Sequence, residues 1–556
     1  VEQGAQAMDA RGDHAGAEAA LLPALAQCAA TRLDYRCASL DLVLGDSYLT
    51  TLRLPDARRV LADGWTRARR GGEWNLEQRF LPLLAQLEAF EDDVAGSRLA
   101  LVRAYTDEMR LREPSRCELD VWGRELVATV LVNRVDLAGA RAELARADEI
   151  RRTCPAAVTN TGSVFLAAHV LRDPAAPPAA VAAVRAEIAA LRATASPTDR
   201  VVLDQSEGRL LIDRDHAAGV ALLERAIAAA RTVSSVDAQK ARSYAYSILT
   251  LDAGRAGEWT RVWQLLGGDA RLAAPATCAV GAAAEDRRSV VVVRDGSGAE
   301  YGAFEDAHAG PIVDAADLMP AELRDRLQGC AAIDVLARPP ILGMPDLLPP
   351  ELAWSYRGDS APSSGPIATS RLVIAGAEPP AALGLPRLAP WRSAAPADVE
   401  LDGPAATPAR VLAELAHAGY VEVHAHGVLD AARADGSFLA LSPHADGRFA
   451  LTAAEIRAQP LAGHPIVVLA ACHGAQAATY RHESWSLPAA FLAAGASAVI
   501  ASSDVISDAD AGAFFDDLRA RLARELSPAV ALRDARVAWL AGHPTASWVR
   551  SLMVFH

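Results

Sequence analysis

Two residues with the chemistry of a nucleophile and a base each follow a run of apolar residues. His426 ends the segment GYVEVHAH, residues 419–426, and Cys472 ends the segment HPIVVLAAC, residues 464–472. Glycine follows His426 directly and follows Cys472 after one residue. A cysteine thiolate attacks a carbonyl carbon when a neighbouring base takes its proton. The pattern therefore predicts a dyad in which Cys472 attacks and His426 is the base.

Attack on a carbonyl also needs hydrogen-bond donors for the oxyanion that develops on the substrate. The backbone N–H groups of Cys472 and Gly427 are the natural candidates, because they adjoin the predicted nucleophile and base. Gly427 has no side chain, so a substrate carbonyl can approach its backbone closely.

The dyad can form only if its two strands are neighbours in one sheet. Beyond residue 287, short β-branched runs alternate with a helical segment at 407–419. The runs that we interpret as strands are 289–296, 331–341, 370–380 and 397–403. This alternation predicts an α/β domain with a mostly parallel sheet, helices on its faces and ligands at the carboxyl ends of its strands. Since neighbouring strands lie ~4.8 Å apart, loops at those ends can bring His426 to Cys472.

The segment before this domain, residues 15–270, is predicted to form one helix after another. Small or apolar residues recur in it with spacings of 40, 43, 40, 40 and 40 residues. These positions are Ala57, Ser97, Ala140, Ala180, Val220 and Thr260. A fixed period of this size with two helices per period is typical of an α-solenoid, in which each repeat packs on its neighbours. Segments such as DLAGARAEL at 136–144 resemble the start of the second helix in tetratricopeptide repeats, although the usual period there is shorter.

The predicted fold class is therefore an α-solenoid followed by an α/β domain. Composition changes near 270–287, where the sequence ARLAAPATCAVGAAAEDR precedes the first strand signal. We expect a helical repeat array over 1–275 and the α/β domain over 286–556.

Composition excludes two kinds of partner. The chain has 556 residues and a formal net charge of −14, so it lacks the basic patch that binding to nucleic acid requires. It has no run of 18 apolar residues that would suggest a membrane span. Aromatic residues are only 5% of the chain against 51% hydrophobic residues in all, which favours close-packed helices in the first part.

Cellular location depends on how the seven cysteines are interpreted. The N-terminal residues VEQGAQAMDARGD have neither the basic start nor the apolar core of a signal peptide, so we expect a cytoplasmic protein. The alternative is an extracytoplasmic protein in which three cysteine pairs form disulfides and Cys472 stays free. These pairs are Cys28 with Cys37, Cys117 with Cys154, and Cys278 with Cys330.

Two other interpretations of the histidine and the cysteine stay open. Either residue alone is more often incidental, as a buried thiol or a histidine at a strand end. The pair His424 and His426 could instead bind zinc, as two histidines of a hydrolase site, with HADG at 444–447 as a source of further ligands. No third ligand stands out, so no metal or other cofactor is expected.

Several motifs in the second part resemble the CHAT family of caspase-like cysteine peptidases, which is related to caspases, separases and gingipains. The motifs are VEVHAHG, DGRFALTAAEI at 446–456, PIVVLAACHGAQ, LPAAFLAAGASAVIAS at 487–502 and SPAVALRDARVAWL at 527–540. The resemblance implies that His426 and Cys472 are catalytic and that His424 supports the site by orienting it. Members of this family often follow tetratricopeptide arrays, which agrees with the repeats before the α/β domain.

The resemblance also suggests that an acidic residue, Asp504, lines the substrate pocket. In relatives that prefer arginine, a carboxylate lines the pocket for the substrate side chain, and Asp504 takes that position here, after the strand that follows Cys472. The other family position for such a carboxylate is Ala470, which carries no charge. Asp504 could instead cap the helix that follows, for which Ser507 and Asp508 are also candidates.

Taken together, these features predict a cysteine endopeptidase that cleaves a protein substrate at a specific site. A regulatory protein partner is expected on the concave surface of the array. The family resemblance implies a role in prokaryotic defence or regulated cell death. A catalytically silent scaffold that acts through protein contacts is the first alternative, and the zinc hydrolase is the second.

Overall fold

The computed structural model divides the chain into two compact units, Val1–Ala245 and a second unit that begins at Tyr246. Each unit is described by itself. The residues that the structure describes are all of 1–556 except 10–12, 32, 52, 91–97, 174–175, 234, 286, 308–311, 313, 359–366, 389–390, 392–396, 429–436, 446, 473, 476–477, 481–482 and 525–526.

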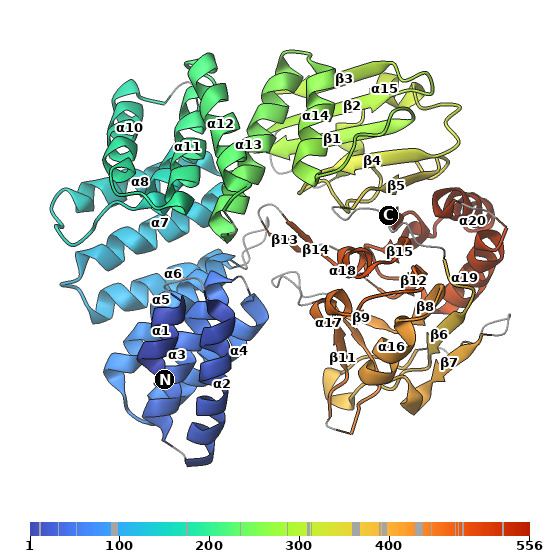
Figure 1. Ribbon diagram of the computed structural model, residues 1–556, viewed down its shortest axis with the longest axis horizontal. Coiled ribbons are helices and arrows are strands. Elements are labelled where there is room, and N and C mark those ends of the chain that lie inside the picture. The colour runs from blue at the N-terminus through green and yellow to red at the C-terminus, as the bar shows by residue number, and fades with distance from the viewer. Residues whose placement is uncertain are drawn as a thin grey trace. The chain divides into compact units, whose positions relative to one another are not determined.

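All the regular secondary structure among the described residues of the first unit is helical (Figure 1). Its helices are α1 (Glu2–Asp9), α2 (His14–Thr31), α3 (Asp34–Thr50), α4 (Leu54–Arg70), α5 (Trp74–Phe90), α6 (Leu99–Arg112), α7 (Cys117–Asn133), α8 (Leu137–Arg151), α9 (Thr161–Val170), α10 (Pro178–Arg192), α11 (Pro197–Leu211), α12 (His216–Ala230) and the first half of α13 (Val236–Arg255).

The helices of this unit pack in consecutive pairs. Helix α3 packs with α4, α5 with α6, α7 with α8, α9 with α10 and α11 with α12, and the first helices of successive pairs contact one another. This arrangement confirms the predicted helical repeats. Ala57 and Ala140, near the starts of α4 and α8, are fully buried, and Ala180 in α10 is partly buried. Ser97 lies outside the described residues.

Helix α14 (Trp259–Ala270), which the sequence analysis assigns to the array, packs on the sheet of the second unit. A Cβ built on Gly281 of the first strand would lie 2.8 Å from Leu266 and 3.1 Å from Trp263, both in α14. Asp269 of α14 also forms a buried ion pair of 2.8 Å with Arg338. The division between the compact units falls within α13, so the last helix of the 40-residue pattern covers a sheet face.

The second unit is built on an 11-stranded mixed sheet with the order β3-β2-β1-β4-β5-β16-β15-β12-β8-β6-β7. Its strands are β1 (Ala279–Glu285), β2 (Arg288–Arg294), β3 (Glu300–Glu305), β4 (Ile333–Ala337), β5 (Trp354–Tyr356), β6 (Arg371–Ala375), β7 (Val399–Asp402), β8 (Tyr420–His424), β12 (Ile466–Ala470), β15 (Ala498–Ser502) and β16 (Leu552–Phe555). Smaller sheets hold β9 (His426–Val428), β10 (Phe438–Ala440) and β11 (Ala450–Thr452), and β13 (Ala478–Tyr480) with β14 (Glu483–Trp485).

Most neighbouring strands of the large sheet are parallel. The antiparallel pairs are β1 with β2, β2 with β3, and β15 with β16. The remaining helices are α15 (Ala321–Asp325), α16 (Pro408–Leu415), α17 (Ala453–Ala458), α18 (Leu487–Ala494), α19 (Asp508–Leu522), α20 (Pro528–Gly542) and the short 3-10 turns η1 (Ala315–Leu318), η2 (Ala381–Leu383), η3 (Gly403–Ala405) and η4 (Ser547–Val549).

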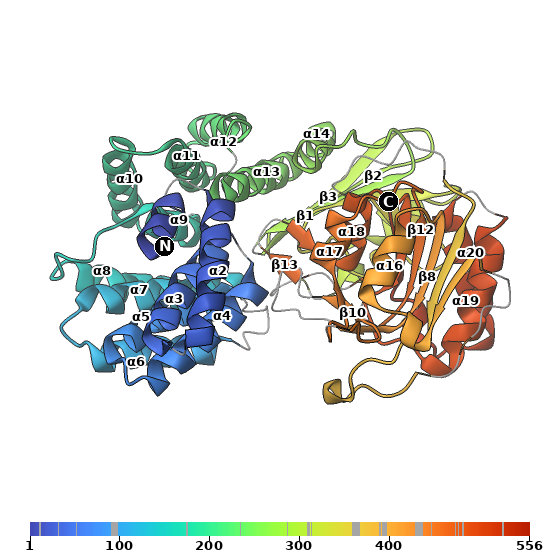
Figure 2. The same ribbon diagram turned by 60° about the horizontal axis from the view of Figure 1, so that its bottom comes forward.

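Helices cover both faces of this sheet (Figure 2). Residues of α16, α17 and α18 share a core with one face of β8, β12 and β15. Residues of α19 and α20 share a second core with the opposite face of the same region. Because side chains alternate along a strand, successive residues of β8 and β12 face these two cores in turn. The predicted α/β domain with a mostly parallel sheet is confirmed.

Six of the seven cysteines form three disulfides, with the pairing that the sequence analysis gives as its alternative. The Cα–Cα distances are 5.5 Å for Cys28–Cys37, 5.9 Å for Cys117–Cys154 and 5.7 Å for Cys278–Cys330, all within the range that a disulfide can bridge. Among the described helices, none combines the length and the apolar character that crossing a membrane requires.

Candidate active site

The strands that carry the predicted dyad, β8 and β12, are parallel neighbours at the centre of one half of the sheet. His424 is the partner of Ala470 in the register of this pair. His426 and Cys472 each lie two residues further along the chain, so both follow the carboxyl end of their strand at the same sheet edge. The prediction that the two strands are adjacent is confirmed.

Backbone contact joins the two loops that follow these strands. A Cβ built on Gly427 would lie 2.1 Å from the carbonyl oxygen of Cys472 and 3.4 Å from the Cβ of Ala471. No side chain fits at a distance of 2.1 Å, so glycine is the residue that allows this approach. Gly427, the residue after the predicted base, therefore lies directly against the backbone of the predicted nucleophile, Cys472.

His426 is partly exposed, and its ring is held by a backbone carbonyl. Its Nε2 lies 2.7 Å from the carbonyl oxygen of Pro386. A carbonyl oxygen only accepts hydrogen bonds, so Nε2 carries a proton and donates it. In the neutral ring, Nδ1 is then the nitrogen that can take a proton from a thiol. Sequence reasoning missed Pro386, because a proline 40 residues upstream carries no local signal of this contact.

Cys472 is partly buried and is not part of a disulfide. Its sulfur lies 3.4 Å from the backbone N–H of Ile506, which donates to it from the loop after β15. An N–H directed at sulfur stabilises negative charge that develops there. The thiol therefore lies between the end of its own strand and the loop that also carries Asp504.

His424 lies in a different environment from His426. It is buried, and its Nε2 lies 2.8 Å from a carboxylate oxygen of Glu422, two residues earlier on the same strand face. Arg519 of α19 donates to both oxygens of Glu422 at 2.8 Å and 3.1 Å, and the hydroxyl of Tyr420 donates to Oε2 at 3.0 Å. The ring of His424 also stacks on Trp391, with centroids 3.6 Å apart.

These contacts decide the charge of Glu422, which is completely buried. Burial alone would raise the pKa of this carboxyl group. The hydrogen bonds and charges of His424 and Arg519 outweigh burial and lower the pKa of Glu422 to about 2. Glu422 is therefore an ionised carboxylate that pairs with the guanidinium group of Arg519 inside the protein, a feature that the sequence analysis did not identify.

Asp504 is exposed in the loop between β15 and α19. Its carboxylate accepts a hydrogen bond of 2.7 Å from the N–H of Val505. The N-cap residue of α19 is Ser507, so Asp504 does not cap that helix. The role of Asp504 in a substrate pocket stays a prediction.

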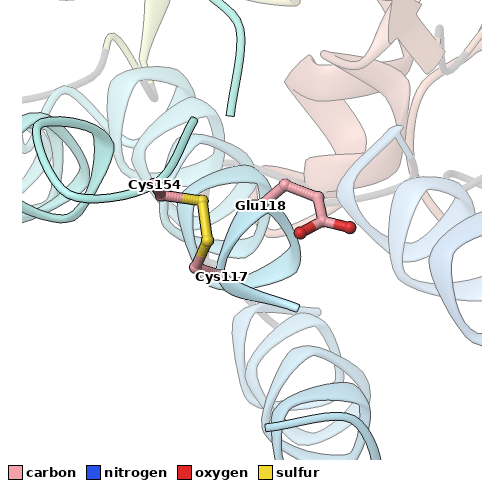
Figure 3. Close-up of side chains that lie close together, drawn as sticks. All are labelled: Cys117, Glu118 and Cys154. Atoms are coloured by element: carbon pink, nitrogen blue, oxygen red, sulfur yellow. A yellow bond between two sulfur atoms is a disulfide. The ribbon is translucent and has the colours of Figure 1, made fainter. Parts of the chain in front are cut away.

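The described residues offer no third ligand for a metal at His424 and His426. Within the described part of the chain, the His, Cys, Asp and Glu atoms that lie close enough to share an ion belong to Cys117, Glu118 and Cys154. The sulfurs of this group are joined to each other in a disulfide, and a carboxylate oxygen of Glu118 lies within 4.8 Å of both (Figure 3). A disulfide has no thiolate to coordinate a metal.

An α/β domain with a cysteine and a histidine after adjacent parallel strands, and with helices on both sheet faces, has a caspase-like architecture. Residues 307–553 match the family model of the CHAT domain, so this part of the chain is a CHAT domain preceded by helical repeats. The match begins after β3, although β1, β2 and β3 extend the same sheet. No curated protein matches the chain.

Proposed function

We propose that the protein is a cysteine endopeptidase with Cys472 as nucleophile and His426 as general base. The observation that carries this proposal is the close approach of Gly427 to the Cys472 carbonyl, which joins the two loops of the dyad. The hydrogen bond from His426 to Pro386 supports it, because an orienting group fixes the base in the way that the third member of a catalytic triad does.

The chemistry proceeds in two stages. Nδ1 of His426 takes the thiol proton, the sulfur of Cys472 bonds to the scissile carbonyl carbon, and backbone N–H groups of Cys472 and Gly427 stabilise the oxyanion. The C–N bond then breaks, and the histidine returns its proton to the leaving amine. Water, deprotonated by the same histidine, next hydrolyses the thioester and frees the enzyme.

Asp504 is the candidate for selecting substrates. Its carboxylate is exposed in the same loop that contacts the sulfur of Cys472, and it has no helix-capping role. A substrate arginine or lysine would gain a charge-assisted hydrogen bond there, of about 1.5–3 kcal/mol.

A peptide-library cleavage assay tests the proposal. Native protein should cleave a subset of peptides, and Cys472→Ala should cleave none. His426→Ala should lose activity by roughly 10²–10⁴-fold, the range that general-base catalysis contributes. Cleavage that survives Cys472→Ala would refute the dyad. A native protein that cleaves nothing, and whose Cys472 no thiol-reactive probe labels, would support the silent scaffold.

The helical array is the proposed site for a regulatory protein partner. It contains a cavity of about 890 Å³ lined by apolar residues, among them Leu42, Leu83 and Met109, and by charged residues of both signs, which are Asp9, Asp46, Glu113, Arg79 and Arg116. A peptide segment with apolar side chains and with both basic and acidic side chains would match this lining. Peptides of that composition should bind the native chain in fluorescence anisotropy and should bind Asp46→Arg more weakly.

The biological setting that the family resemblance suggests is prokaryotic defence or regulated cell death. If so, expression of the native chain with its activator should be toxic to a bacterial host, and Cys472→Ala should relieve the toxicity. The three disulfides favour an oxidising compartment, because the cytosol keeps thiols reduced. Mass spectrometry of protein from its native host would show whether the three pairs are oxidised there.

A further inference from the structure

The carbonyl that holds His426 belongs to a segment without regular secondary structure. Pro386 follows η2, and the described residues 384–388 form neither helix nor strand. A hydrogen bond from such a segment can orient a catalytic base only if the segment is itself fixed in place. Trp391, five residues further along the chain, supplies contacts that can fix it.

Trp391 lies in a slot made by β8 and α19. Its ring stacks on His424 with an interplanar angle of 17° and a centroid distance of 3.6 Å. The guanidinium carbon of Arg519 lies 5.4 Å from the centroid of the same ring. A Cβ built on Gly512 would lie 2.6 Å from Cδ1 of Trp391, so this position of α19 admits the indole only because it has no side chain.

The carboxylate of Glu422 binds both polar groups that line the slot, the ring of His424 and the guanidinium group of Arg519. Its carboxylate accepts hydrogen bonds from His424 and from Arg519, and Asp516 accepts a further bond of 2.6 Å from Arg519. These hydrogen bonds fix the orientation of the His424 ring and of the Arg519 guanidinium group. A flat aromatic ring next to such groups gains stacking and cation–π attraction, which an aliphatic side chain of the same size lacks.

We propose that Trp391 is a positioning residue of the active site: seated in the slot of His424, Arg519 and Gly512, it anchors the segment that carries Pro386 and so orients His426. This inference rests on the proposed dyad. In this proposal His424 does not contact the substrate, because its role is to line the slot that holds Trp391. Displacing Trp391 should disturb the base while the strands that carry the dyad stay in place.

The test measures how fast iodoacetamide alkylates Cys472 at neutral pH, which needs no known substrate. Gly512→Ala forces the indole from its slot, since the new methyl group would lie 2.6 Å from the ring. Gly542→Ala is the matched control, because a Cβ there meets nothing within 4 Å. Trp391→Phe keeps an aromatic ring for the slot, and Trp391→Leu keeps only apolar bulk.

We expect alkylation to slow by roughly tenfold in Gly512→Ala and Trp391→Leu, within the losses that small misplacements of catalytic groups cause. Trp391→Phe should retain most of the native rate, and Gly542→Ala all of it. Rescue by phenylalanine at unchanged melting temperature separates an anchoring role from a purely structural one. If Gly512→Ala fails to fold, the comparison of Trp391→Leu with Trp391→Phe decides alone.

Failure of the anchor and failure of the dyad give different results. If His426→Ala slows alkylation but the Trp391→Leu and Gly512→Ala variants match the native rate, the anchor is wrong and the dyad stands. If His426→Ala leaves the rate unchanged, the dyad itself is wrong. Equal rates for Trp391→Leu and Trp391→Phe would also overturn the anchor, because stacking would then not matter.

Discussion

Replacing Glu422 with glutamine tests whether the buried charges beside the candidate active site stabilise the second unit. The partners of Glu422 lower its pKa from the ordinary 4.5 to about 2. A difference of that size corresponds to about 3 kcal/mol in favour of the ionised carboxylate in the folded protein. Glu422→Gln keeps the shape and removes the charge, so it should lower the free energy of unfolding by about 3 kcal/mol at neutral pH.

The direction of the pH dependence follows from the lowered pKa. The carboxyl group is more acidic in the folded state than in the unfolded state, so its contribution is fully present above pH 4.5 and is lost as the pH falls toward 2. At about pH 3 the same linkage leaves roughly 1.5 kcal/mol. The difference between the native protein and Glu422→Gln should therefore shrink to about half on acidification.

Scanning calorimetry of the full chain at neutral pH and at about pH 3 measures both effects. At neutral pH the transition of the second unit should fall by roughly 5–10 °C, since about 1 kcal/mol shifts a domain of this size by a few degrees. Glu322→Gln, which changes an exposed carboxylate of α15, is the matched control and should leave the transition unchanged. A shift that is the same at both pH values, or smaller than that of the control, would refute the reasoning.

Three further substitutions test other parts of the molecule. Gly427→Ala should lower cleavage roughly a hundredfold, because its Cβ would collide with the Cys472 carbonyl, while Gly542→Ala should not; equal activities would contradict the loop contact. Replacing Cys117 and Cys154 with serine should cost roughly 4 kcal/mol of stability in an oxidised sample and nothing in a reduced one, and a loss in both would show that the bond is not the cause. Asp504→Asn should reduce cleavage after basic residues roughly ten- to hundredfold and leave Cys472 alkylation unchanged, and a native preference for apolar residues would exclude the acidic pocket.

Much of the fold can be predicted from the sequence where local patterns and tertiary packing agree. The strands β2, β4, β6, β8 and β12 are β-branched or apolar runs, and each begins within two residues of the predicted start, although β4 and β6 end four and five residues before the predicted end. The start of the helical segment predicted at 407–419 agrees with α16, whose N-cap is Thr407 and whose first residue is Pro408. The adjacency of β8 and β12 follows from chemistry, since a cysteine and a histidine at strand ends suggest a shared site.

Other features depend on packing that no local pattern reports. Strand β1 has the sequence AVGAAAE, which reads as helix or linker because alanine favours helices, yet it is completely buried between β2 and β4. Helix α14 continues the 40-residue period, but its tryptophans and leucines cover the sheet. The contacts of His426 with Pro386 and of His424 with Trp391 join segments 33 to 40 residues apart, and only the folded chain brings them together.

The position of β16 in the sheet has a consequence for the order of events during synthesis. β16 pairs with β5 on one side and with β15 on the other, so it alone links the two halves of the large sheet. Leu552 follows Tyr356 by 196 residues, which a ribosome takes roughly 10–40 s to add. The edge of β5 stays open throughout that interval, and the edge of β15 is open from the synthesis of Ser502 until β16 follows. An open edge can pair with the wrong strand or with another nascent chain. The sheet can therefore close only after both of its halves have been synthesised, and closure requires contacts that are remote along the chain and slow to form.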